Sequence, residues 1–527
     1  MGTRIGIDVG GTNTDAVLMN GTNVIAWVKH PTTDLVEDGI VSAIRVVLGD
    51  SSISPDSVKA VMIGTTQFTN AFVEARDLLK VGVIRLATPS GNALPPMISW
   101  PERLRQAVEG LVFMLPGGYQ FDGRPISEFD PRLVREAARK IQRQDLKSVA
   151  ISSVFAPINA GMERLAAEIV RQECPDVHIT ISSSIGRIGL LERESAAIMN
   201  ASLACIARRV TGSFRMALDE LGLGCPFFVS QNDGTLMSAK FAEQLPIRAF
   251  ASGQTNSIRG AAFLTGSRDS IVIDIGGTTS DIGVLVNGFP RESSISANIG
   301  GVRTNFRMPD VLSIGLGGGS IVSAAPELYL SSSLPDHAYC LGPESVGHKL
   351  LQRACLFGGD TLTMSDVAVS AGLANFGDPA RIPAISDAVK NTVIHRAQRI
   401  LEEGIDRMKI GAGDVPVIVV GGAGFLLKEK PRGASILIRP DHAQVANAIG
   451  AAIGQVSGEL DRIVNYADLG REQALKKICA EVTEIARVAG AASGTVAVTD
   501  IEELAVNYLP GDAVRIRARA VGDLHFS

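Results

Sequence analysis

Aromatic side chains are scarce in this chain, and the signals of several well-known protein classes are missing. Aromatic residues make up 5% of the 527 residues and indicate no clear stacking platform for a ligand ring. No block of five or more like charges occurs and the net charge is only −5, so nothing indicates a nucleic-acid or membrane surface. The seven histidines lack the H-x-x-x-H and H-E-x-x-H spacings of zinc sites, and the G-x-S-x-G motif of serine hydrolases is missing.

Cysteine pairs and long apolar runs are missing as well. The six cysteines are scattered without C-x-x-C spacing, which predicts ordinary buried thiols in a reducing compartment. The strongest apolar run, VPVIVVGGAGFLL from Val415, is interrupted by glycines and is shorter than the ~20 residues of a membrane span. No basic-then-apolar signal opens the chain. We therefore expect a cytoplasmic protein with neither a membrane nor a nucleic acid as its partner.

Glycine, in contrast, is abundant. The chain has 55 glycines, about a tenth of its residues against a usual ~7%. They gather in short loops, as expected where a backbone approaches a ligand. With 46% apolar residues over 527 positions, the chain has enough apolar side chains for two or three domains, each with its own core.

One glycine-bearing motif occurs twice, roughly half a chain apart. RIGIDVGGTNTDAVLMNG begins at Arg4, and SIVIDIGGTTSDIGVLVNG begins at Ser270. In each copy an alternating segment predicts a strand, a polar turn follows, and a second strand ends at Asn-Gly, which is a tight hairpin signal. VIAWVKH from Val24 adds a third strand to the first copy. The pattern predicts a β-meander, present twice, with a glycine pair in its first turn.

The two turns have the composition of phosphate-binding loops. Little side chain blocks Gly10–Thr12 or Gly276–Thr278, so their backbone N–H groups can surround an anion and the threonine hydroxyls add donors. Asp8 and Asp274 end the preceding strands, where a carboxylate would repel a phosphate unless a divalent cation such as Mg²⁺ lay between them. We interpret the pair as two loops that grip one polyphosphate across a cleft. The alternative is two ordinary hairpins from an old duplication.

A third glycine loop follows a buried strand. VPVIVV ends at Gly421-Gly422-Ala423-Gly424, and glycines at the carboxyl end of a strand let adenosine lie close to the backbone and a helix begin. The alternative is that this turn only serves packing. The first two glycine pairs are neither P-loops nor Rossmann fingerprints, because strands rather than helices follow them.

The order of the three loops resembles the actin-like ATPase superfamily, and within it the chain is similar to the hydantoinase/oxoprolinase A-subunit family. The similar segments are IGIDVGGTNTDAVL, IGTTQFTNAFVEARDLLKVGVI, LERESAAIMNASL, SQNDGTLMSAKFA, IDIGGTTSDIGVL, LSIGLGGGSI, LGPESVG and VVGGAG. Two segments depart from the family pattern: Leu191 replaces a tyrosine, and ASGQTNSIRGAA from Ala251 stands where the family reads S-G-P-A-G-G. The chain is also shorter than the usual A subunit and contains no B-type catalytic half.

The resemblance implies an α/β fold with two duplicated actin-like (RNase H-like) ATPase domains around a nucleotide cleft, and with inserted and C-terminal α/β segments. We divide the chain accordingly into three segments. Residues 1–185 form an N-terminal domain with the first phosphate loop, and residues 186–455 form an A-type domain with the second phosphate loop and the adenosine loop. Residues 456–527 form a C-terminal helix and strand segment.

The resemblance also implies ATP and Mg²⁺ as cofactors, and the expected site residues fall into three groups. Asp8 and Asp274 are assigned to Mg²⁺, usually through waters. Of Asp15 and Asp281, one is expected to orient the acceptor or a water and the other to close its turn. The nucleotide is assigned to Gly10, Gly11, Thr12, Asn13, Gly276, Gly277, Thr278, Thr279, Gly318, Gly421, Gly422 and Gly424. Gly318 lies in GLGGGS, which is either a nucleotide-contact loop or a hinge.

Two further pairs of residues are open between a functional and a structural role. Thr65 and Thr66 lie in GTTQFTNA, which is either a turn with helix-cap chemistry or a wall of the substrate cleft. Arg193 and Asn200 are two helical turns apart and share a face. A buried arginine there requires an acidic partner or an anionic ligand.

The C-terminal end contains a predicted helix and a predicted strand. REQALKKICAEVTEIARVAGA has a single apolar face and ends at Gly490. In AVRIRARAV, Arg515, Arg517 and Arg519 alternate with apolar residues and therefore lie on one side of the strand. We interpret this stripe as a solvated face, with a partner contact as the alternative.

The function that the resemblance implies is ATP-dependent hydrolysis of a cyclic amide such as a hydantoin, 5-oxoproline or a lactam. This chain would phosphorylate the carbonyl oxygen and so create a good leaving group. A separate B-type or other hydrolase subunit would complete ring opening. Two other functions stay open: a small-metabolite kinase, which needs a general base near the acceptor hydroxyl, and an actin-like ATPase that acts as a reactivating or chaperone factor.

Overall fold

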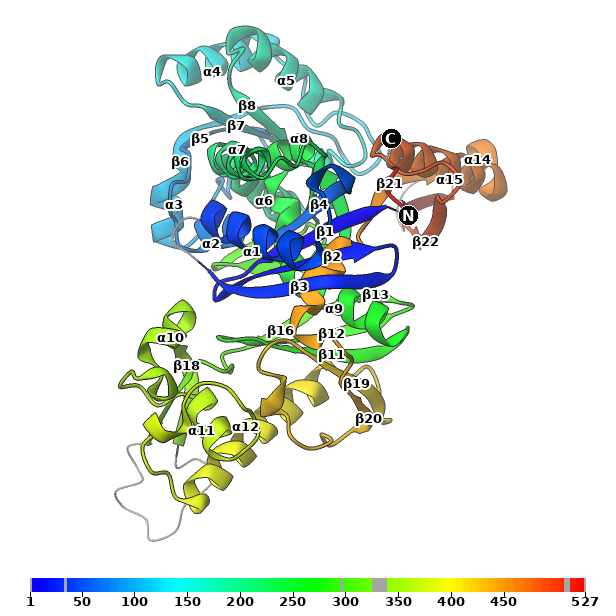
Figure 1. Ribbon diagram of the computed structural model, residues 1–527. Coiled ribbons are helices and arrows are strands. Elements are labelled where there is room, and N and C mark those ends of the chain that lie inside the picture. The colour runs from blue at the N-terminus through cyan, green and yellow to red at the C-terminus, as the bar shows by residue number, and fades with distance from the viewer. Residues whose placement is uncertain (1, 33–35, 294–296, 325–338, 507–511, 526–527) are drawn as a thin grey trace.

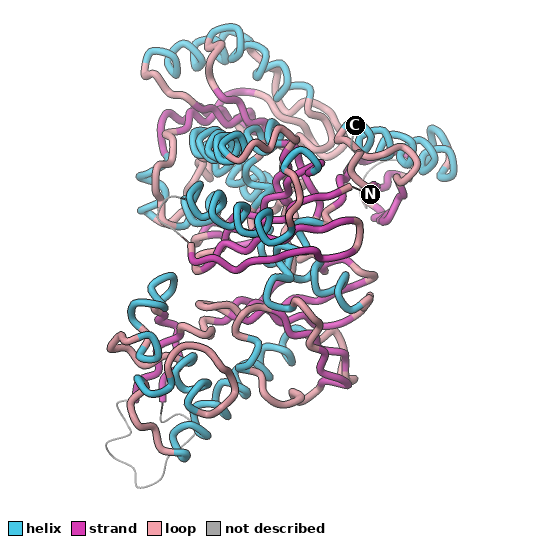
Figure 2. The backbone as a smooth tube through the Cα atoms, in the orientation of Figure 1, coloured by secondary structure: helices cyan, strands magenta, loops and turns pink. Residues whose placement is uncertain are grey.

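The chain folds into two lobes, one above the other in the view of Figure 1. The computed structural model describes residues 2–32, 36–293, 297–324, 339–506 and 512–525. The N-terminal strands and the C-terminal segment both belong to the upper lobe (Figure 1), and Figure 2 shows strands of each lobe facing the junction between them. Within the described residues, no helix combines the length and apolar character needed to cross a membrane.

The first sheet belongs to the upper lobe and has nine strands in the order β22-β23-β21-β10-β9-β4-β1-β2-β3. Its meander consists of β1 (Thr3–Val9), β2 (Asn13–Asn20) and β3 (Asn23–Pro31), which confirms the prediction. Next to the meander, β4 (Val58–Thr65) runs parallel to β1. The other strands are β9 (Phe227–Ser230), β10 (Thr235–Ser238), β21 (Gln455–Asn465), β22 (Ala497–Ala505) and β23 (Ala513–Gly522).

The second sheet belongs to the lower lobe and repeats the plan of the first. The strands β11 (Ser270–Ile275) and β12 (Ser280–Val286) pair antiparallel, and β19 (Val415–Val420) runs parallel to β11. Asp274 lies opposite Asp281 in the second sheet, just as Asp8 lies opposite Asp15 in the first. The sheet is completed by β13 (Phe289–Pro290), β16 (Val311–Ile314) and β20 (Ala434–Ile438). The predicted α/β fold with a duplicated unit is therefore confirmed.

Two helices lie between the sheets and join the lobes. The helix α9 (Ser252–Thr265) packs on β11 and β12, α13 (Ala446–Ala452) packs on β1 and β2, and the two helices pack on each other. A Cβ at Gly260 or at Gly450 would overlap a backbone carbonyl oxygen of the other helix. Glycine is therefore required where the helix backbones touch. This contact lies directly behind the strands that carry the predicted loops.

An inserted α/β segment sits at the top of the upper lobe in Figure 1. Its sheet has the order β6-β5-β7-β8, and its helices α4 and α5 pack against each other. The bounds are β5 (Val81–Thr88), β6 (Glu109–Pro116), β7 (Ser148–Ser153), β8 (His178–Ile181), α4 (Pro131–Arg143) and α5 (Gly161–Glu173).

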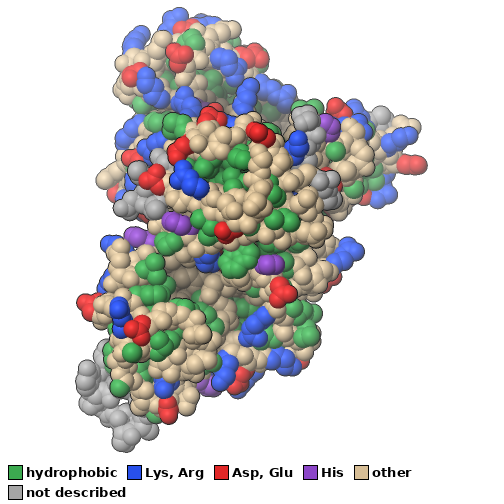
Figure 3. All heavy atoms as spheres, in the orientation of Figure 1, with side chains coloured by type: hydrophobic (Ala, Val, Ile, Leu, Met, Phe, Trp, Pro, Cys, Tyr) green, Lys and Arg blue, Asp and Glu red, His purple; other side chains and the backbone are tan. Residues whose placement is uncertain are grey.

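The remaining elements cover the sheets. In the upper lobe they are α1 (Val36–Ser51), α2 (Gln67–Val73), α3 (Glu102–Val108), α6 (Leu190–Ser202), α7 (Ala204–Glu220), α8 (Ala239–Gln244), β14 (Ala297–Ile299), β15 (Val302–Thr304), α14 (Tyr466–Leu469) and α15 (Arg471–Val488). In the lower lobe they are β17 (Ser320–Ala324), β18 (Tyr339–Ser345), α10 (Leu350–Arg353), α11 (Met364–Ser370) and α12 (Asp387–Met408). Figure 3 shows the surface hollowed where the lobes meet, with charges of both signs on this face.

The first sheet takes strands from all three sequence segments, 1–185, 186–455 and 456–527. The boundaries at 185 and 455 therefore do not separate one sheet from another, and the domain division stays a prediction. Within the C-terminal segment, α15 is followed by Gly490 with φ of +107°, as predicted.

The interpretation of the C-terminal arginine stripe as a solvated face is wrong. The side chains of Arg515, Arg517 and Arg519 lie on β23 but are only 16%, 12% and 8% exposed. Each forms ion pairs with carboxylates of neighbouring segments. The three arginines do share one side of the strand, but that side faces carboxylates of neighbouring segments instead of water.

Candidate functional site

The two glycine loops meet each other at the junction of the lobes. The hydroxyl oxygens of Thr12 and Thr278 lie 3.3 Å apart. A Cβ at Gly277 would lie 3.0 Å from the Thr12 side chain, so glycine permits this approach. Loops from two different sheets thus lie against each other, and a nucleotide cleft between them stays a prediction.

The two loops also have the same internal geometry. The N–H of Gly10 donates to the carbonyl of Asn13 at 3.0 Å, and the N–H of Gly276 donates to the carbonyl of Thr279 at 2.9 Å. Space is open beside Gly11, where an added Cβ would find no atom within 4 Å. An anion could therefore approach the first loop at Gly11 without meeting a side chain.

Asp8 is a buried carboxylate with one unsatisfied oxygen. Its side chain is 4% exposed, and Oδ2 accepts from Asn447 Nδ2 at 3.0 Å. Oδ1 is buried and has no hydrogen-bond partner among the residues that the structure describes. Burial raises the pKa of Asp8 to about 7, and the charges of Asp15 and Asp274 add to the rise. The site therefore disfavours negative charge at Asp8 unless a cation is nearby.

Lys29 and Asn447 are site residues that sequence reasoning missed. The Lys29 ammonium donates to both carboxylate oxygens of Asp15, at 2.7 and 2.6 Å. The Asn447 amide donates to both Asp8 and Asp15. Within the part of the chain that the structure describes, Asp15 thus has a cationic partner at hydrogen-bonding distance, whereas Asp8 has none.

Asp274 faces the same space from the second sheet. Its Oδ2 accepts from the Ser257 hydroxyl of α9. Burial raises its pKa and the charge of Asp15 adds to the rise, whereas the Ser257 hydrogen bond and Lys29 lower it. The backbone of Gly421 approaches so closely that a Cβ there would overlap Asp274 Oδ1, and its φ of +89° also favours glycine.

Asp281 lies opposite Asp274 on β12. The loss of water around it raises its pKa to about 7, against a lowering effect of the hydrogen bond that it accepts from the Ser313 hydroxyl. The two aspartates that follow the loops therefore differ in partner, because Asp15 is held by a cation and Asp281 by a hydroxyl.

Gly318 contacts the backbone of the second loop through a hydrogen bond. Its N–H donates to the Gly276 carbonyl at 3.0 Å, and its own carbonyl accepts from the Ser365 backbone at 2.8 Å. A Cβ at Gly318 would lie 3.0 Å from the Ser365 hydroxyl and 3.3 Å from Ala423. The structure thus brings the GLGGGS loop against the second loop, and a direct contact of Gly318 with nucleotide stays a prediction.

The third glycine loop lies next to the second. The N–H of Ala423 donates to the carbonyl of Ile275 at 2.8 Å, and a Cβ at Gly422 would lie 3.5 Å from Lys29 of the first sheet. The expectation that a helix follows is wrong, because only a 3₁₀ turn, Gly424–Leu426, comes after the strand. All three predicted loops nevertheless converge on one region.

The GTT segment borders Asp8. A Cβ at Gly64 would overlap Asp8 Oδ1, and the Thr66 hydroxyl donates to the carbonyl of Val9 at 3.4 Å. The Thr65 hydroxyl accepts from Gln67 N–H at the start of α2. Thr65 thus has a local structural role, and Thr66 lies at the edge of the site.

Arg193 and Asn200 are fully buried and do not reach the loops. The guanidinium of Arg193 donates to the Ser182 hydroxyl and to the carbonyls of Arg187, Ile188 and Ser153. The Asn200 amide donates to Thr180 and to the carbonyl of Gln244. Their hydrogen bonds support a structural role.

The acids of the site suit a hard cation that is shared with a ligand. Among the described residues, no group of three or more His, Cys, Asp or Glu side chains is placed to hold a metal ion. Mg²⁺, however, commonly takes one or two carboxylates together with waters and phosphate oxygens. A cation between Asp8 and Asp274 would satisfy the unpartnered oxygen of Asp8 and offset the repulsion among the carboxylates.

Two family-level matches cover most of the chain. Residues 4–174 match the hydantoinase/oxoprolinase N-terminal region, and residues 193–378 match hydantoinase/oxoprolinase. An uncharacterized protein of Methanocaldococcus jannaschii is 26% identical over 92% of this chain and 77% of its own length. The caprolactamase subunit alpha of Pseudomonas jessenii is 25% identical over 87% of this chain and 70% of its own. The acetophenone carboxylase gamma subunit of Aromatoleum aromaticum is 26% identical over 70% and 53%.

Two solved structures share the fold. The ATP-dependent caprolactamase from Pseudomonas jessenii is 21% identical with a TM-score of 0.77, and nucleotide-free acetone carboxylase is 18% identical with a TM-score of 0.71. Each match covers 99% of this chain and 88% of the other. At these identities the likeness establishes the arrangement of the lobes and sheets.

Proposed function

The chain belongs to the hydantoinase/oxoprolinase family, and on that premise we propose that it is the ATP-dependent subunit of an enzyme that opens a cyclic amide. In this proposal the chain transfers a phosphoryl group from ATP to the carbonyl oxygen of the ring. A separate subunit then completes the hydrolysis. The caprolactamase relative is itself named as a subunit, which supports a partner.

The observation that carries the proposal is the meeting of the two loops over buried acids. Thr12 and Thr278 touch, and Asp8 and Asp274 lie close enough that the charge of one raises the pKa of the other. A pair of unrelated hairpins would have no reason to bury carboxylates against each other at a cost in stability. A shared cationic ligand provides that reason.

The residues divide the work of binding. ATP with Mg²⁺ supplies the phosphoryl group, and catalysis of its transfer consists mainly of positioning and charge neutralisation. Asp8 and Asp274 would hold the metal, usually through waters. The phosphates are assigned to residues 10–13 and 276–279, and the adenosine to Gly421, Gly422 and Gly424.

The acceptor side of the site has two aspartates with different partners. Asp15 is held by Lys29 and Asn447, which fixes its orientation and keeps a positive charge beside the loops. Asp281 has only the Ser313 hydroxyl and a pKa raised to about 7. We therefore assign Asp281 to orienting the acceptor or a water, and Asp15 with Lys29 to closing the first loop.

Phosphorylation solves a chemical problem of amides. The nitrogen lone pair is delocalised into the carbonyl, so the carbonyl carbon is a poor electrophile. Transfer of the phosphoryl group to the carbonyl oxygen creates a good leaving group at that carbon. Exclusion of water from between the lobes would limit wasteful hydrolysis of ATP.

A second candidate is activation of a ketone oxygen, favoured by the acetophenone carboxylase gamma subunit among the relatives.

The cyclic-amide proposal is tested by incubating the chain, with and without its partner subunit, with Mg-ATP and with hydantoin, 5-oxoproline, caprolactam or acetophenone. ADP release coupled to ring opening supports the cyclic-amide proposal. A stable phosphorylated product without hydrolysis indicates a kinase, and substrate-independent turnover indicates a reactivating or chaperone ATPase. Ketone-dependent turnover alone indicates the second candidate.

A further inference from the structure

Six arginines and five carboxylates form one connected network of ion pairs at the C-terminal half of the first sheet. The members are Arg187, Arg248, Arg307, Arg515, Arg517 and Arg519 on one side and Asp233, Glu292, Glu459, Asp461 and Glu502 on the other. Among the described residues, the network therefore contains one more arginine than carboxylates. It lies outside the glycine loops and has no part in the proposed phosphoryl transfer.

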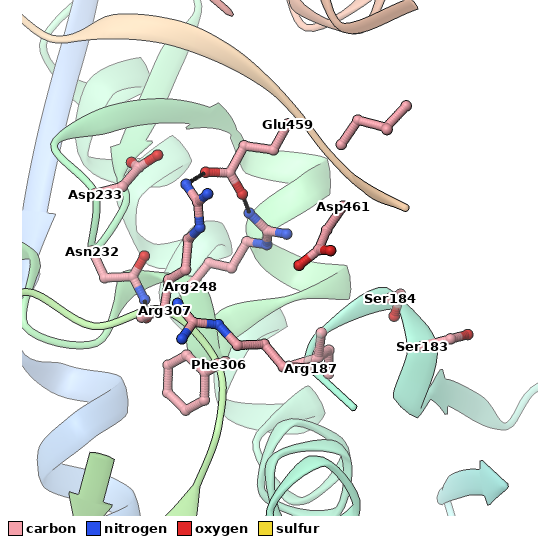
Figure 4. Close-up of a pocket in the computed structure, with 13 residues that line it drawn as sticks. Ser183, Ser184, Arg187, Asn232, Asp233, Arg248, Phe306, Arg307, Glu459 and Asp461 are labelled. Atoms are coloured by element: carbon pink, nitrogen blue, oxygen red, sulfur yellow. Dashed lines mark hydrogen bonds and ion pairs between the residues drawn. The ribbon is translucent and has the colours of Figure 1, made fainter. Parts of the chain in front are cut away.

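A cavity of about 190 Å³ opens beside this network. It is lined by Arg187, Arg248 and Arg307, together with Glu459 and Asn232 (Figure 4). Glu459 lies between two of the guanidinium groups, 3.6 Å from Arg248 and in direct contact with Arg307 (Figure 4). Asp233 and Asp461 line the cavity as well, so its wall holds three arginines and three carboxylates.

Arg187 is the least satisfied member of the wall. Within the described residues, its guanidinium makes no hydrogen bond, and its closest acid is Glu292 at 3.9 Å. Burial lowers the pKa of Arg187, and repulsion from Arg517 and Arg307 lowers it further. Among the described residues, the Nε atoms of Arg517 and Arg519 are also buried without a hydrogen-bond partner, but neither arginine lines the cavity. The weakly paired guanidinium of Arg187 in the cavity wall, together with the excess of arginines in the network, favours an anionic ligand.

We propose that this cavity binds a small monocarboxylate, held by the guanidinium of Arg187 beside Arg248 and Arg307. The planar fork of arginine matches the two oxygens of a carboxylate. One negative charge balances the excess of the network. A phosphate would bring a second charge close to Glu459 and Asp461, so a carboxylate fits this wall better.

The cavity is separate from the glycine loops but touches the same helix. The carbonyl of Asn232 accepts from the Thr255 hydroxyl of α9 at 3.0 Å, and two residues further along α9 Ser257 donates to Asp274. The first turns of α9 therefore stand between the cavity and the acids of the loops. Binding at the cavity is consequently expected without nucleotide and without competition from it.

The test uses the full chain without nucleotide, with butyrate as the probe and its neutral analogue butyramide as a matched control at constant ionic strength. Butyrate is expected to raise the melting temperature saturably by a few degrees, and butyramide is expected to leave it unchanged. Arg187→Gln should abolish the shift, because it removes the least paired guanidinium. Arg164→Gln, which changes an exposed arginine of α5, should retain it.

Three results would overturn the inference: no shift with butyrate, a full shift in the Arg187→Gln variant, or loss of the shift when Mg-ATP is added. A larger Arg187-dependent shift with inorganic phosphate than with butyrate would contradict the carboxylate assignment. If Arg187→Gln fails to fold, Arg187→Lys serves instead. It keeps the charge but loses the fork and should weaken butyrate binding at least tenfold, and unchanged binding would count against the inference.

Discussion

The hydroxyl oxygens of Thr12 and Thr278 lie 3.3 Å apart although 266 residues separate them in the chain. Each threonine follows a glycine pair, and each glycine pair follows a strand whose next-to-last residue is aspartate. The contact therefore joins two copies of one structural unit face to face. A ligand that spans both copies must contact the backbone N–H groups of both. A substitution in either copy should therefore weaken binding of the same ligand.

Gly11→Ala is expected to weaken nucleotide binding without affecting the fold. No atom lies within 4 Å of the added Cβ, so the methyl group meets nothing unless a phosphate occupies that space. The dissociation constant for a fluorescent ATP analogue with Mg²⁺ should rise about tenfold or more, equivalent to about 1.4 kcal/mol. Gly413→Ala, which also projects into open space, should change neither binding nor the melting temperature. Normal affinity in Gly11→Ala would place the phosphates elsewhere.

Asp8→Asn is expected to stabilise the chain while abolishing most ATP turnover. The pKa of Asp8 is raised to about 7, so its contribution to stability is present below the unfolded value near 3.8 and is lost as pH rises through 7. A neutral asparagine avoids this loss. Without Mg²⁺, urea unfolding should show the variant more stable than the wild type by up to about 4 kcal/mol at pH 8. The difference should shrink toward zero near pH 4. A variant that is less stable at pH 8 would contradict the charge assignment.

Lys29→Met is expected to reduce turnover roughly 10²-fold, as loss of a preorganised charge does at other sites. It leaves Asp15 without its cationic partner beside Asp8 and Asp274. Steady-state ADP release is the readout, and Lys476→Met on the exposed face of α15 is the matched control. Near-normal turnover would show that the Lys29–Asp15 ion pair only stabilises the pairing of β3 with β2.

His178→Gln is expected to make the chain less sensitive to acid. Burial lowers the pKa of His178 from 6.5 to about 4, and the charge of Arg208 adds to this. Because the unfolded chain takes up the proton first, wild-type stability falls as pH drops from 6.5 to 4. The slope of the urea midpoint over that range should be smaller in His178→Gln and unchanged in His525→Gln, whose side chain is exposed. Equal slopes in all three proteins would refute the prediction.

The sequence predicted the features that local patterns determine. Alternation and the Asn-Gly turns located both meanders, and the glycine pairs marked the loops that the structure brings together. The order of the motifs was sufficient for the family and the duplicated α/β fold. These predictions succeeded because strands, tight turns and glycine loops are each encoded by patterns only a few residues long.

Lys29 was missed because its position depends on an irregularity in pairing. The β2–β3 hairpin shifts register between Leu18 and Met19, and this shift places Lys29 opposite Asp15. A regular hairpin counted back from its turn would place Val28 there. Asn447 was missed for another reason: it reaches the site from α13, more than 400 residues away.

The environment of the arginine stripe could not be predicted from the sequence either. Alternation indicates that Arg515, Arg517 and Arg519 share a side of the strand, but it does not say what covers that side. Glu292 and Asp233 come from distant segments and form ion pairs with Arg517 and Arg519. A charged face becomes an interior ion-pair network only through such tertiary contacts.

The most direct test of a shared nucleotide site is a calorimetric titration of a non-hydrolysable ATP analogue with Mg²⁺ into the wild type, Asp8→Asn and Asp274→Asn. If both lobes hold one nucleotide, the wild type binds one molecule per chain, and each substitution alone weakens that same event at least about tenfold. Two independent binding events, or full affinity in either variant, would contradict it.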